Sequence, residues 1–535
     1  MTPQTTDAPP KPPHPSSSSP SPPPRVVWGE AIGAAVLATV LLSLWLGTGA
    51  MLFDNDSLYA DVARSMAREG TWLDPQIHGV PFLDKPPLFF WILGVFMEVF
   101  GDSIAILRLP AALFGGATVG AVVYGARRSG LSRLGAAIGA AGVLSVPLFG
   151  EYARRVYMEV PVAFCVLGAI LAFQHGMTGL GAEEGRAGAD PRAFLVAGLM
   201  AGMGFMFKSL VGLFGVIPFA LLLLVERRWE LLRSGWLWGG VGIALLLVVP
   251  WHGYQLITNT DAFLQFTWKL HVEDQIFDAQ PWSTGPPWFY ATKLVFDEPA
   301  LGALMLIGLG GAISRAVAAR QGEAKGLSPL DRHLVLALLV ALAIFSASET
   351  KKLLYLIPLI PIAALLVARV LGEMRAPIQG AVLAAVVLMG IRTVPVYHPS
   401  GPFLHGVSDQ IPVATAIRDA SREGETIRIL DDYFSTVQYY AERRAESYWQ
   451  KPTLVQQTQR IPYIRFGDNM YHVPPPKVVE TMVRDKPGVW VVRPDLWVHL
   501  KPALGDRAKV LFVPEGCTAD SDKDTGACVV LRTGS

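Results

Sequence analysis

Long apolar stretches recur along this chain of 535 residues, and they constrain its fold more than any other feature. An α-helix of roughly 20 apolar residues crosses the hydrocarbon core of a bilayer, which is about 30 Å thick. Stretches near this length lie at 26–50, 108–126, 134–150, 157–176, 192–207, 209–225, 236–256, 299–317, 331–347, 353–370 and 377–395. The apolar segment 88–100 is shorter and is either a partial span or an interfacial helix. The pattern predicts a mainly α-helical polytopic bundle of about 11 to 13 spans, here taken as residues 26–395.

The composition agrees with a chain surrounded by membrane lipids. Charged residues make up 17% of the sequence, against about 25% in soluble domains. The formal net charge is +1, so no nucleic-acid partner is predicted. Residues 1–25 are rich in proline and serine, which predicts a disordered tail. The apolar run that follows is long enough to be a signal anchor instead of a cleaved signal peptide.

The distribution of lysine and arginine predicts the orientation of the bundle. Cytoplasmic loops carry an excess of these residues. If the N-terminal tail is cytoplasmic, every predicted inner loop is basic. Those loops contain Arg127, Arg128, Arg133, Arg186, Arg192, Arg227, Arg228, Arg233, Arg315, Arg320, Lys325, Arg332, Arg369 and Arg375. Two long loops, 51–107 and 257–298, and the tail 396–535 then share the outer face.

The tail 396–535 differs in character from the rest of the chain. It is polar, and its short β-like runs lie at 426–430, 488–492, 509–513 and 528–532. Helical patterns occur between them, in VATAIRDASREG and TVQYYAERRAE. These patterns predict a small soluble α/β domain outside the membrane. Cys517 and Cys528 lie close together within it and form either a disulfide or two free thiols.

The first outer loop concentrates ionisable residues that have a functional and a structural interpretation. Asp54 and Asp56 directly follow the first span. Carboxylates at the mouth of a span usually face water or a cavity, although Asp56 is also suited to capping the helix that follows. Asp84 and Lys85 precede two prolines that restrict the backbone. The pair can bind a metal and a phosphate, or it can be a surface ion pair.

Further candidates lie at the outer ends of other spans. His271, in the second outer loop, is a candidate metal ligand or general base, although a single histidine is more often structural. Arg154, Lys208 and Lys351 are cations near the same face, and Tyr355 follows Lys351 closely. Several cations at one face suit an anionic ligand such as a lipid phosphate. Each cation can instead extend to the interface from an apolar surrounding.

These segments together resemble a known family. YADVARSMAREGTWLDPQIHGVPFLDKPPLFFW (59–91), RLPAALFG (108–115), ARRVYMEVP (153–161) and SASETKKLLYLIPLIPIAALL (346–366) stand in the order of the GT-C-fold glycosyltransferases that use polyprenyl-phosphate sugars. The resemblance is to the bacterial branch with the lipid A aminoarabinose transferases, and more distantly to protein O-mannosyltransferases. It implies a multi-pass protein of the bacterial inner membrane, with its N-terminus cytoplasmic and its C-terminal domain periplasmic.

The resemblance also implies a reaction and its catalytic residues. A sugar on a polyprenyl phosphate is transferred, with inversion, to a lipid, glycan or protein acceptor, in lipopolysaccharide or protein glycosylation. Asp56 or Asp54 takes the role of the catalytic acid, and Lys85 matches the family's lysine. The family has an Asp-Glu pair where this chain has Asn55 and Asp56, so the choice between the two aspartates stays open.

Two further sets of residues are implied. Lys351 and Tyr355 match positions on the side of the donor phosphate. Lys208 and Arg154, cations of the same face, are assigned to that phosphate with them. Asp84 and His271 match a pair that binds a divalent metal ion in some relatives, although Leu270 stands where those relatives often have glutamate.

Two other classes of function remain as alternatives. A secondary transporter or lipid flippase would favour ionisable residues near the middle of the membrane and internal repeats. A non-catalytic membrane scaffold would leave the DKPP loop unexplained.

Overall fold

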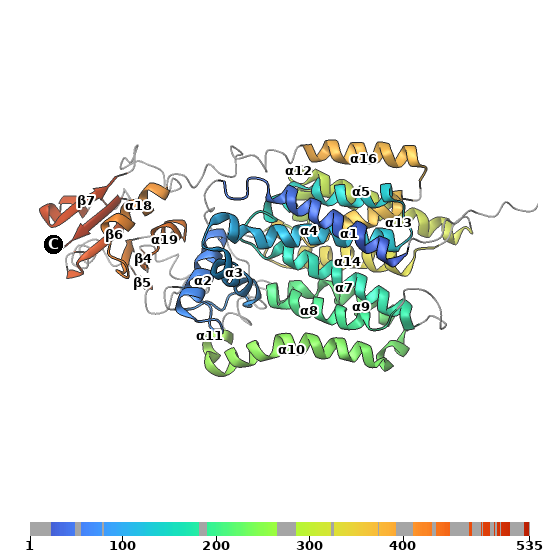
Figure 1. Cartoon of the computed structure of the whole chain (residues 1–535), viewed down its shortest axis with the longest axis horizontal. Coiled ribbons are helices and arrows are strands. Elements are labelled where there is room, and N and C mark those ends of the chain that lie inside the picture. Colours follow the sequence, from blue (N-terminus) through green and yellow to red (C-terminus); the bar gives the residue numbers. More distant parts are fainter. Residues whose placement is uncertain are drawn as a thin grey trace, which may run out of the picture.

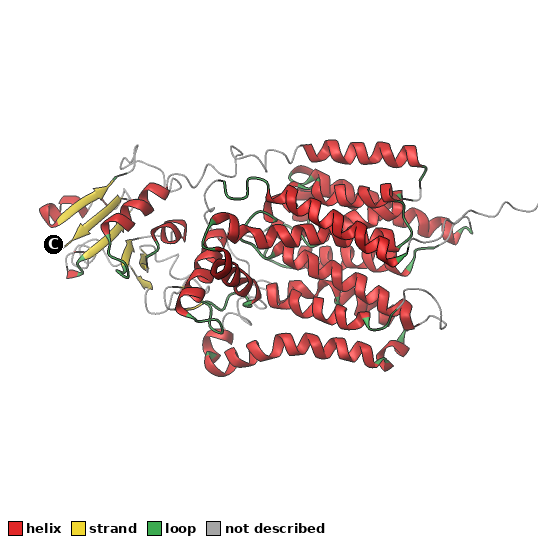
Figure 2. Ribbon diagram, in the orientation of Figure 1, coloured by secondary structure: helices red, strands yellow, loops and turns green. Residues whose placement is uncertain are grey.

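The computed structural model describes residues 23–48, 55–77, 80–180, 190–264, 285–322, 326–372, 374–391, 410–430, 435–443, 445–449, 470–472, 483, 485–492, 497, 500–502, 504–513 and 529–533. Most of the tail 1–25, together with Cys517 and Cys528, lies outside these ranges, so the predictions made for them stay predictions. Figures 1 and 2 show a bundle of helices and, at one of its ends, a small domain with a sheet.

The bundle occupies the chain up to residue 391. Its helices are α1 (Pro24–Ser43), α2 (Asn55–Glu69), α3 (Leu88–Phe100), α4 (Ile104–Arg128), α5 (Arg133–Leu144), α6 (Pro147–Tyr152), α7 (Glu159–Leu180), α8 (Ala193–Lys208), η1 (Ser209–Gly215), α9 (Ile217–Val225), η2 (Trp229–Arg233), α10 (Gly235–Thr258), α11 (Thr260–Leu264), α12 (Phe289–Phe296), α13 (Pro299–Arg320), α14 (Pro329–Ala347), η4 (Leu353–Leu356), α15 (Leu359–Leu371) and α16 (Ala376–Ile391). A two-stranded ribbon, β1 (Gln76–Ile77) with β2 (Val80–Pro81), follows α2.

The chain is a multi-pass membrane protein. In the described part, eight helical stretches are long and apolar enough to cross a bilayer. The prediction of about eleven spans counted more, for two reasons. The structure's helices at two of the predicted spans, α5 and α16, are shorter than a full span, and Ala193–Val225, predicted as two spans, is one apolar stretch of 33 residues.

That long stretch reverses direction at the end of α8. Ser209 has a φ of 48°, and η1 then packs back against α8. A Cβ on Gly212 would lie 2.0 Å from the carbonyl carbon of Gly204, so the two segments approach as closely as only glycines allow. Lys208 therefore lies at a turn, as the division of this region into spans 192–207 and 209–225 predicted.

The most buried membrane helix is α15. Nearly all of its residues are buried, including both Leu359 and Leu366. By contrast, α1 and α10 expose large apolar side chains, such as Val36 and Leu246, as expected of helices that face lipid. A helix that is apolar on all sides packs at the centre of a bundle. The packing therefore places α15 at the core, and Figure 1 shows α10 at one margin.

The C-terminal domain is α/β, as predicted. Its elements are α18 (Gln410–Ala420), β3 (Ile427–Leu430), α19 (Ser435–Ala441), β4 (Ala445–Trp449), β5 (Met470–His472), β6 (Gly488–Val492), η8 (Gly505–Arg507), β7 (Ala508–Phe512) and β8 (Val529–Thr533). The six strands run in the order β5-β4-β3-β6-β8-β7. The first four are parallel, and β8 pairs antiparallel with both β6 and β7.

All four predicted strands form, but the helical prediction for TVQYYAERRAE is wrong in its second half. The helix α19 stops at Ala441, and Glu442 has a φ of 53°, which a continuing helix does not allow. The residues that follow become β4 because they pair in register with β3. Strand β5 was not predicted at all.

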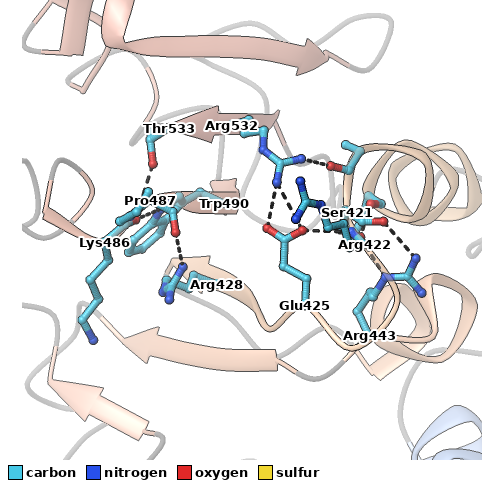
Figure 3. Close-up of polar contacts among 12 residues, drawn as sticks. Ser421, Arg422, Glu425, Arg428, Arg443, Lys486, Pro487, Trp490, Arg532 and Thr533 are labelled. Atoms are coloured by element: carbon cyan, nitrogen blue, oxygen red, sulfur yellow. Dashed lines mark hydrogen bonds and ion pairs between the residues drawn. The ribbon is translucent and has the colours of Figure 1, made fainter. Parts of the chain in front are cut away.

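Polar contacts join the segment after α18 to strand β8 and to the segment after α19 (Figure 3). Arg532 donates to both carboxylate oxygens of Glu425 at 3.1 and 3.2 Å, and Arg443 donates to the hydroxyl of Ser421 at 2.9 Å. Arg428 donates to the carbonyl of Pro487 and lies over the ring of Trp490. These bonds connect elements within the domain, and we assign them a structural role.

Candidate functional site

Helix α2 carries Asp56 in its first turn. Its apolar residues Tyr59, Val62, Ala63 and Met66 recur at helical spacing and are all buried. This buried face fixes the rotation of α2 against the bundle. Negative charge in a first turn also favours the helix, because it interacts well with the positive end of the helix dipole.

The carboxylate of Asp56 is fully buried and lies among positive groups. Its Oδ1 accepts a hydrogen bond of 2.5 Å from the backbone N–H of Val156, and its Oδ2 lies 3.7 Å from Nη2 of Arg108. Arg155 also interacts electrostatically with Asp56. Burying a charge is expensive unless it is paired and hydrogen-bonded. Asp56 meets this condition through residues from α4 and from the segment before α7.

Arg108 was not among the predicted site residues. It lies 4% exposed in α4, and its guanidinium donates to the carbonyls of Leu46 and Thr48 at 3.2 and 3.1 Å. It thereby joins the end of the first span to the Asp56 site. The available signal was an arginine at the start of an apolar stretch, in the motif RLPAALFG, whose arginine received no predicted role.

Arg155, the neighbour of the predicted Arg154, faces the same site. Its guanidinium lies 5.2 and 4.8 Å from the ring centroids of Tyr152 and Tyr157, and it donates to Glu151 at 2.8 Å. Burial would lower the pKa of Arg155, but the charge of Asp56 and the other neighbours outweigh it and raise the pKa. Arg155 is therefore a permanent cation held beside Asp56.

A second polar cluster forms around Lys208. Its Nζ lies 2.5 Å from Oε1 of Glu159 and 5.2 Å from the ring centroid of Tyr355. The charges of Asp84 and Lys85 also act on Lys208. These residues come from α7, the turn after α8, the DKPP loop and η4. The DKPP loop, Lys208 and Tyr355, which were all predicted to lie at one face, therefore lie close enough for their charges to interact.

Asp84 and Lys85 form a close pair of their own. Nζ of Lys85 lies 2.7 Å from Oδ2 of Asp84 and also donates to the Asp84 backbone carbonyl at 3.3 Å. Both side chains are mostly buried, with 11% and 14% exposed. The exposed ion pair considered for these residues is therefore excluded, and the pair lies within the protein.

The other two predicted phosphate-side cations lie in different surroundings. Nη2 of Arg154 donates to the carbonyl of Leu44 at 2.6 Å, near the end of α1. Nζ of Lys351 donates to the carbonyls of Ser346 and Ser348, at the end of α14. Both bond backbone carbonyls, and their part in phosphate binding stays a prediction.

Two predicted residues, Asp54 and His271, lie outside the described residues. The predicted metal pair of Asp84 and His271 therefore stays a prediction. Within the described ranges, no group of three or more histidine, cysteine, aspartate or glutamate side chains is placed to hold a metal ion. Oδ2 of Asp84 is bonded to Lys85, so this carboxylate already has a cationic partner.

The chain is similar in sequence to known transferases. The family described as dolichyl-phosphate-mannose-protein mannosyltransferase matches residues 84–254. An undecaprenyl phosphate-alpha-4-amino-4-deoxy-L-arabinose arabinosyl transferase of Pseudomonas savastanoi pv. phaseolicola is 28% identical over 384 residues, or 67% of this chain and 66% of that relative. The protein of the same name from Aeromonas salmonicida is 27% identical over 59% of this chain and 55% of its own. The chain thus spans less than two thirds of the length of these relatives.

The fold is shared with a solved structure over nearly its whole length. The crystal structure of ArnT from Cupriavidus metallidurans bound to undecaprenyl phosphate superposes with a TM-score of 0.72, at 17% identity, over 94% of this chain and 98% of that one. The apo structure of the same protein gives 0.72 at 16% identity. The chain is therefore a polytopic membrane protein with the GT-C fold that this ArnT structure has.

Proposed function

We propose that this chain is an inverting glycosyltransferase, which moves a sugar from a polyprenyl-phosphate donor to a lipid, glycan or protein acceptor. The observation that carries the proposal is the buried carboxylate of Asp56, held in place by Val156 and by Arg108. It occurs in a chain similar to proteins that are named for transfer from undecaprenyl phosphate-linked aminoarabinose.

Asp56 is suited to act at the anomeric carbon. In the transfer, an acceptor oxygen forms a bond to this carbon while the carbon–oxygen bond to the lipid phosphate breaks. The carboxylate takes the proton when the acceptor is a hydroxyl, and stabilises the positive charge of the sugar when the acceptor is already an anion. Because Val156 and Arg108 hold Asp56 before substrate arrives, little reorganisation is needed at the moment of reaction.

The Lys208 cluster is suited to the other half of the reaction, in which the phosphate leaves. Negative charge increases on the phosphate as its bond to the sugar breaks, and a nearby ammonium stabilises that charge. Lys208 and Lys85 are each paired with an acid, Glu159 and Asp84. These acids balance the positive charges of the buried lysines before the donor binds. Tyr355 packs beneath Lys208 and limits where its ammonium can move.

The location of the site supports transfer at the outer face of a bacterial inner membrane. Helices α2 and α3 lie at the end of the bundle that carries the C-terminal domain (Figure 1). The predicted inner loops, at the other end, are the basic ones. We therefore place the C-terminal domain in the periplasm and the N-terminal tail in the cytoplasm.

The first experiment asks whether the chain turns over lipid-linked sugars. Purified protein is incubated with a panel of polyprenyl-phosphate sugars, with lipid A, glycan and peptide acceptors, and the released polyprenyl phosphate is measured. We expect release with at least one donor, and a loss in Lys85→Ala that Asp261→Asn, a change at an exposed position on α11, does not share. Asp54→Asn, tested beside Asp56→Asn, decides which aspartate is needed. No release with any donor would contradict the proposal.

The same protein in liposomes tests the alternative of transport. The Lys208–Glu159 pair is buried at the ends of two apolar helices, α8 and α7, and transporters also use buried ionisable residues. Movement of a lipid-linked sugar across the bilayer, without release of polyprenyl phosphate, would favour a flippase over a transferase.

A further inference from the structure

A buried arginine in the second half of helix α2, Arg64, joins this helix to its neighbours. Arg64 lies eight residues after Asp56, about two turns and about 12 Å along the helix. It is 6% exposed. Its Nε and Nη2 donate to the two carboxylate oxygens of Asp102 at 2.6 and 3.2 Å, just before α4 begins. This bidentate arrangement uses the planar geometry that only arginine provides.

The third partner of Arg64 comes from the C-terminal domain. Its Nη1 donates to the backbone carbonyl of Tyr439 on α19 at 2.7 Å, and its Cζ lies 3.9 Å from the centroid of the Tyr439 ring. The ring is 4% exposed and packs into the hydrophobic core of the helical bundle. One guanidinium thus joins α2, the start of α4 and the C-terminal domain.

Two other observations show that this contact is specific. The hydroxyl of Tyr439 points to the same carboxylate, 3.5 Å from Oδ1 of Asp102. One turn further along α2, Arg68 and Glu442 also connect the two domains, at 3.0 Å, but their side chains are 55% and 37% exposed. Exposed ion pairs contribute little, whereas removing one partner of a buried pair is costly. Of these two arginines, Arg64 therefore makes the stronger polar connection between α2 and the C-terminal domain.

We propose that Arg64 is a positioning residue, through which the C-terminal domain holds α2 and thereby keeps the carboxylate of Asp56 in its reactive place. As far as turnover is concerned, this inference rests on the proposed function. A helix is a stiff rod, so a rotation or shift at Arg64 reaches the first turn at Asp56. The domain is then part of the catalytic unit, although no residue of it needs to touch the sugar.

The test compares Arg64→Ala and Arg64→Lys with Arg68→Ala as a matched control on the same helix and interface. Amide hydrogen exchange is measured in the full-length protein over residues 55–63 and at Val156, whose N–H bonds Asp56. We expect exchange to rise about tenfold in Arg64→Ala, to rise less in Arg64→Lys, and to stay at the wild-type rate in Arg68→Ala. If Arg64→Ala does not fold, Arg64→Lys decides, because lysine keeps the charge but not the bidentate geometry.

Turnover of the same variants gives the second measurement. We expect kcat to fall about 100-fold in Arg64→Ala while the KM for the donor stays unchanged, since a small misplacement of a reacting group mainly slows the chemical step. Unchanged exchange in the Arg64 variants would overturn the proposed hold on α2. Increased exchange with an unchanged kcat would overturn the positioning role. If the wild type releases no polyprenyl phosphate, the proposed function has failed, while exchange still decides whether Arg64 holds α2.

Discussion

The backbone N–H of Val156 donates to Oδ1 of Asp56 at 2.5 Å, across 100 residues of sequence. Val156 lies in the short segment between α6 and α7, and Glu159, three residues further on, pairs with Lys208. The segment from Val156 to Glu159 therefore connects the two polar clusters. Asp56, the carboxylate proposed to act on the sugar, lies at the Val156 end of this segment. Lys208, the cation proposed to act on the phosphate, lies at the Glu159 end.

The pair of Lys208 and Glu159 gives a prediction that separates stability from activity. Lys208→Met leaves the buried Glu159 without its cation, and we expect a loss of roughly 3–5 kcal/mol in the free energy of unfolding. The double variant Lys208→Met/Glu159→Gln removes both charges and should recover most of this stability. Its turnover should stay about 100-fold low, because the phosphate has lost a cation.

Thermal unfolding in detergent and the release of polyprenyl phosphate measure these two effects. The double variant Lys293→Met/Asp297→Asn is the control, because it removes an ion pair with side chains 34% and 40% exposed. Turnover at the wild-type rate in the Lys208/Glu159 double variant would show that Lys208 does not act on the leaving phosphate.

Glu298 gives a prediction about pH. It is 5% exposed at the start of α13, and burial, together with Glu151 and Asp297, raises its pKa to about 7 against the opposing effect of a hydrogen bond from the Leu148 backbone. The folded state therefore holds this proton more tightly than the unfolded state does. The contribution of Glu298 to the free energy of unfolding is fully present below pH 4.5, the ordinary pKa of a glutamate, and is lost as the pH rises to about 7. The loss is about 3 kcal/mol.

Glu298→Gln should remove this dependence. We expect the variant to unfold at a higher temperature than the wild type above pH 7, and at nearly the same temperature near pH 4.5. Thermal unfolding from pH 4.5 to about pH 8 checks the prediction, with Asp297→Asn as the exposed neighbour. A constant difference between Glu298→Gln and the wild type at all pH values would contradict it.

Asp74 gives a prediction about the second outer loop. Its carboxylate accepts bonds from the Tyr254 hydroxyl at 2.9 Å, the Gln255 amide at 2.9 Å and the Asn259 amide at 3.1 Å. These three donors lie at the end of α10, directly before the loop that contains His271. Asp74→Ala removes one acceptor from each of these three donors, which should cost about 1–3 kcal/mol in stability.

The same change should raise the KM for the donor, because it loosens the attachment of the second outer loop to the first. Stability and donor KM are measured together. Asp190→Ala is the control, since Asp190 accepts an exposed backbone bond far from this loop. An unchanged KM in Asp74→Ala would show that this attachment does not serve donor binding.

The helical bundle was predictable because its signals are local. Each span is a continuous apolar stretch. The turn at Lys208 was indicated by a charged residue within one of these stretches. The strands β3, β6, β7 and β8 were likewise marked by runs of β-branched and apolar residues. The first two residues of strand β4, Ala445 and Glu446, were predicted as helix and the rest of the strand was not predicted, because its conformation is decided by its pairing with β3.

The partners within the site were not predictable from the sequence. The motifs selected Asp56, Lys85, Lys208 and Tyr355, but no spacing indicates that Val156 bonds Asp56. Arg108 and Arg155 escaped prediction for the same reason, because their role follows from helix packing that brings α4 and the segment before α7 against α2. Arg64 has the pattern of an ordinary charge on an amphipathic helix, and only its partner on α19 distinguishes it.

The central claim is that Asp56 acts at the reacting sugar, and one comparison tests it most directly. The kcat for release of polyprenyl phosphate is measured in Asp56→Asn, which keeps the size of the side chain and an acceptor for the Val156 N–H, and in the control Asp261→Asn. We predict a fall of about 100-fold or more in Asp56→Asn, with the donor KM close to that of the wild type. The thermal unfolding temperature should fall, because the buried Arg108 loses its anionic partner. A kcat within about threefold of the wild type, in a folded Asp56→Asn protein, would contradict the claim.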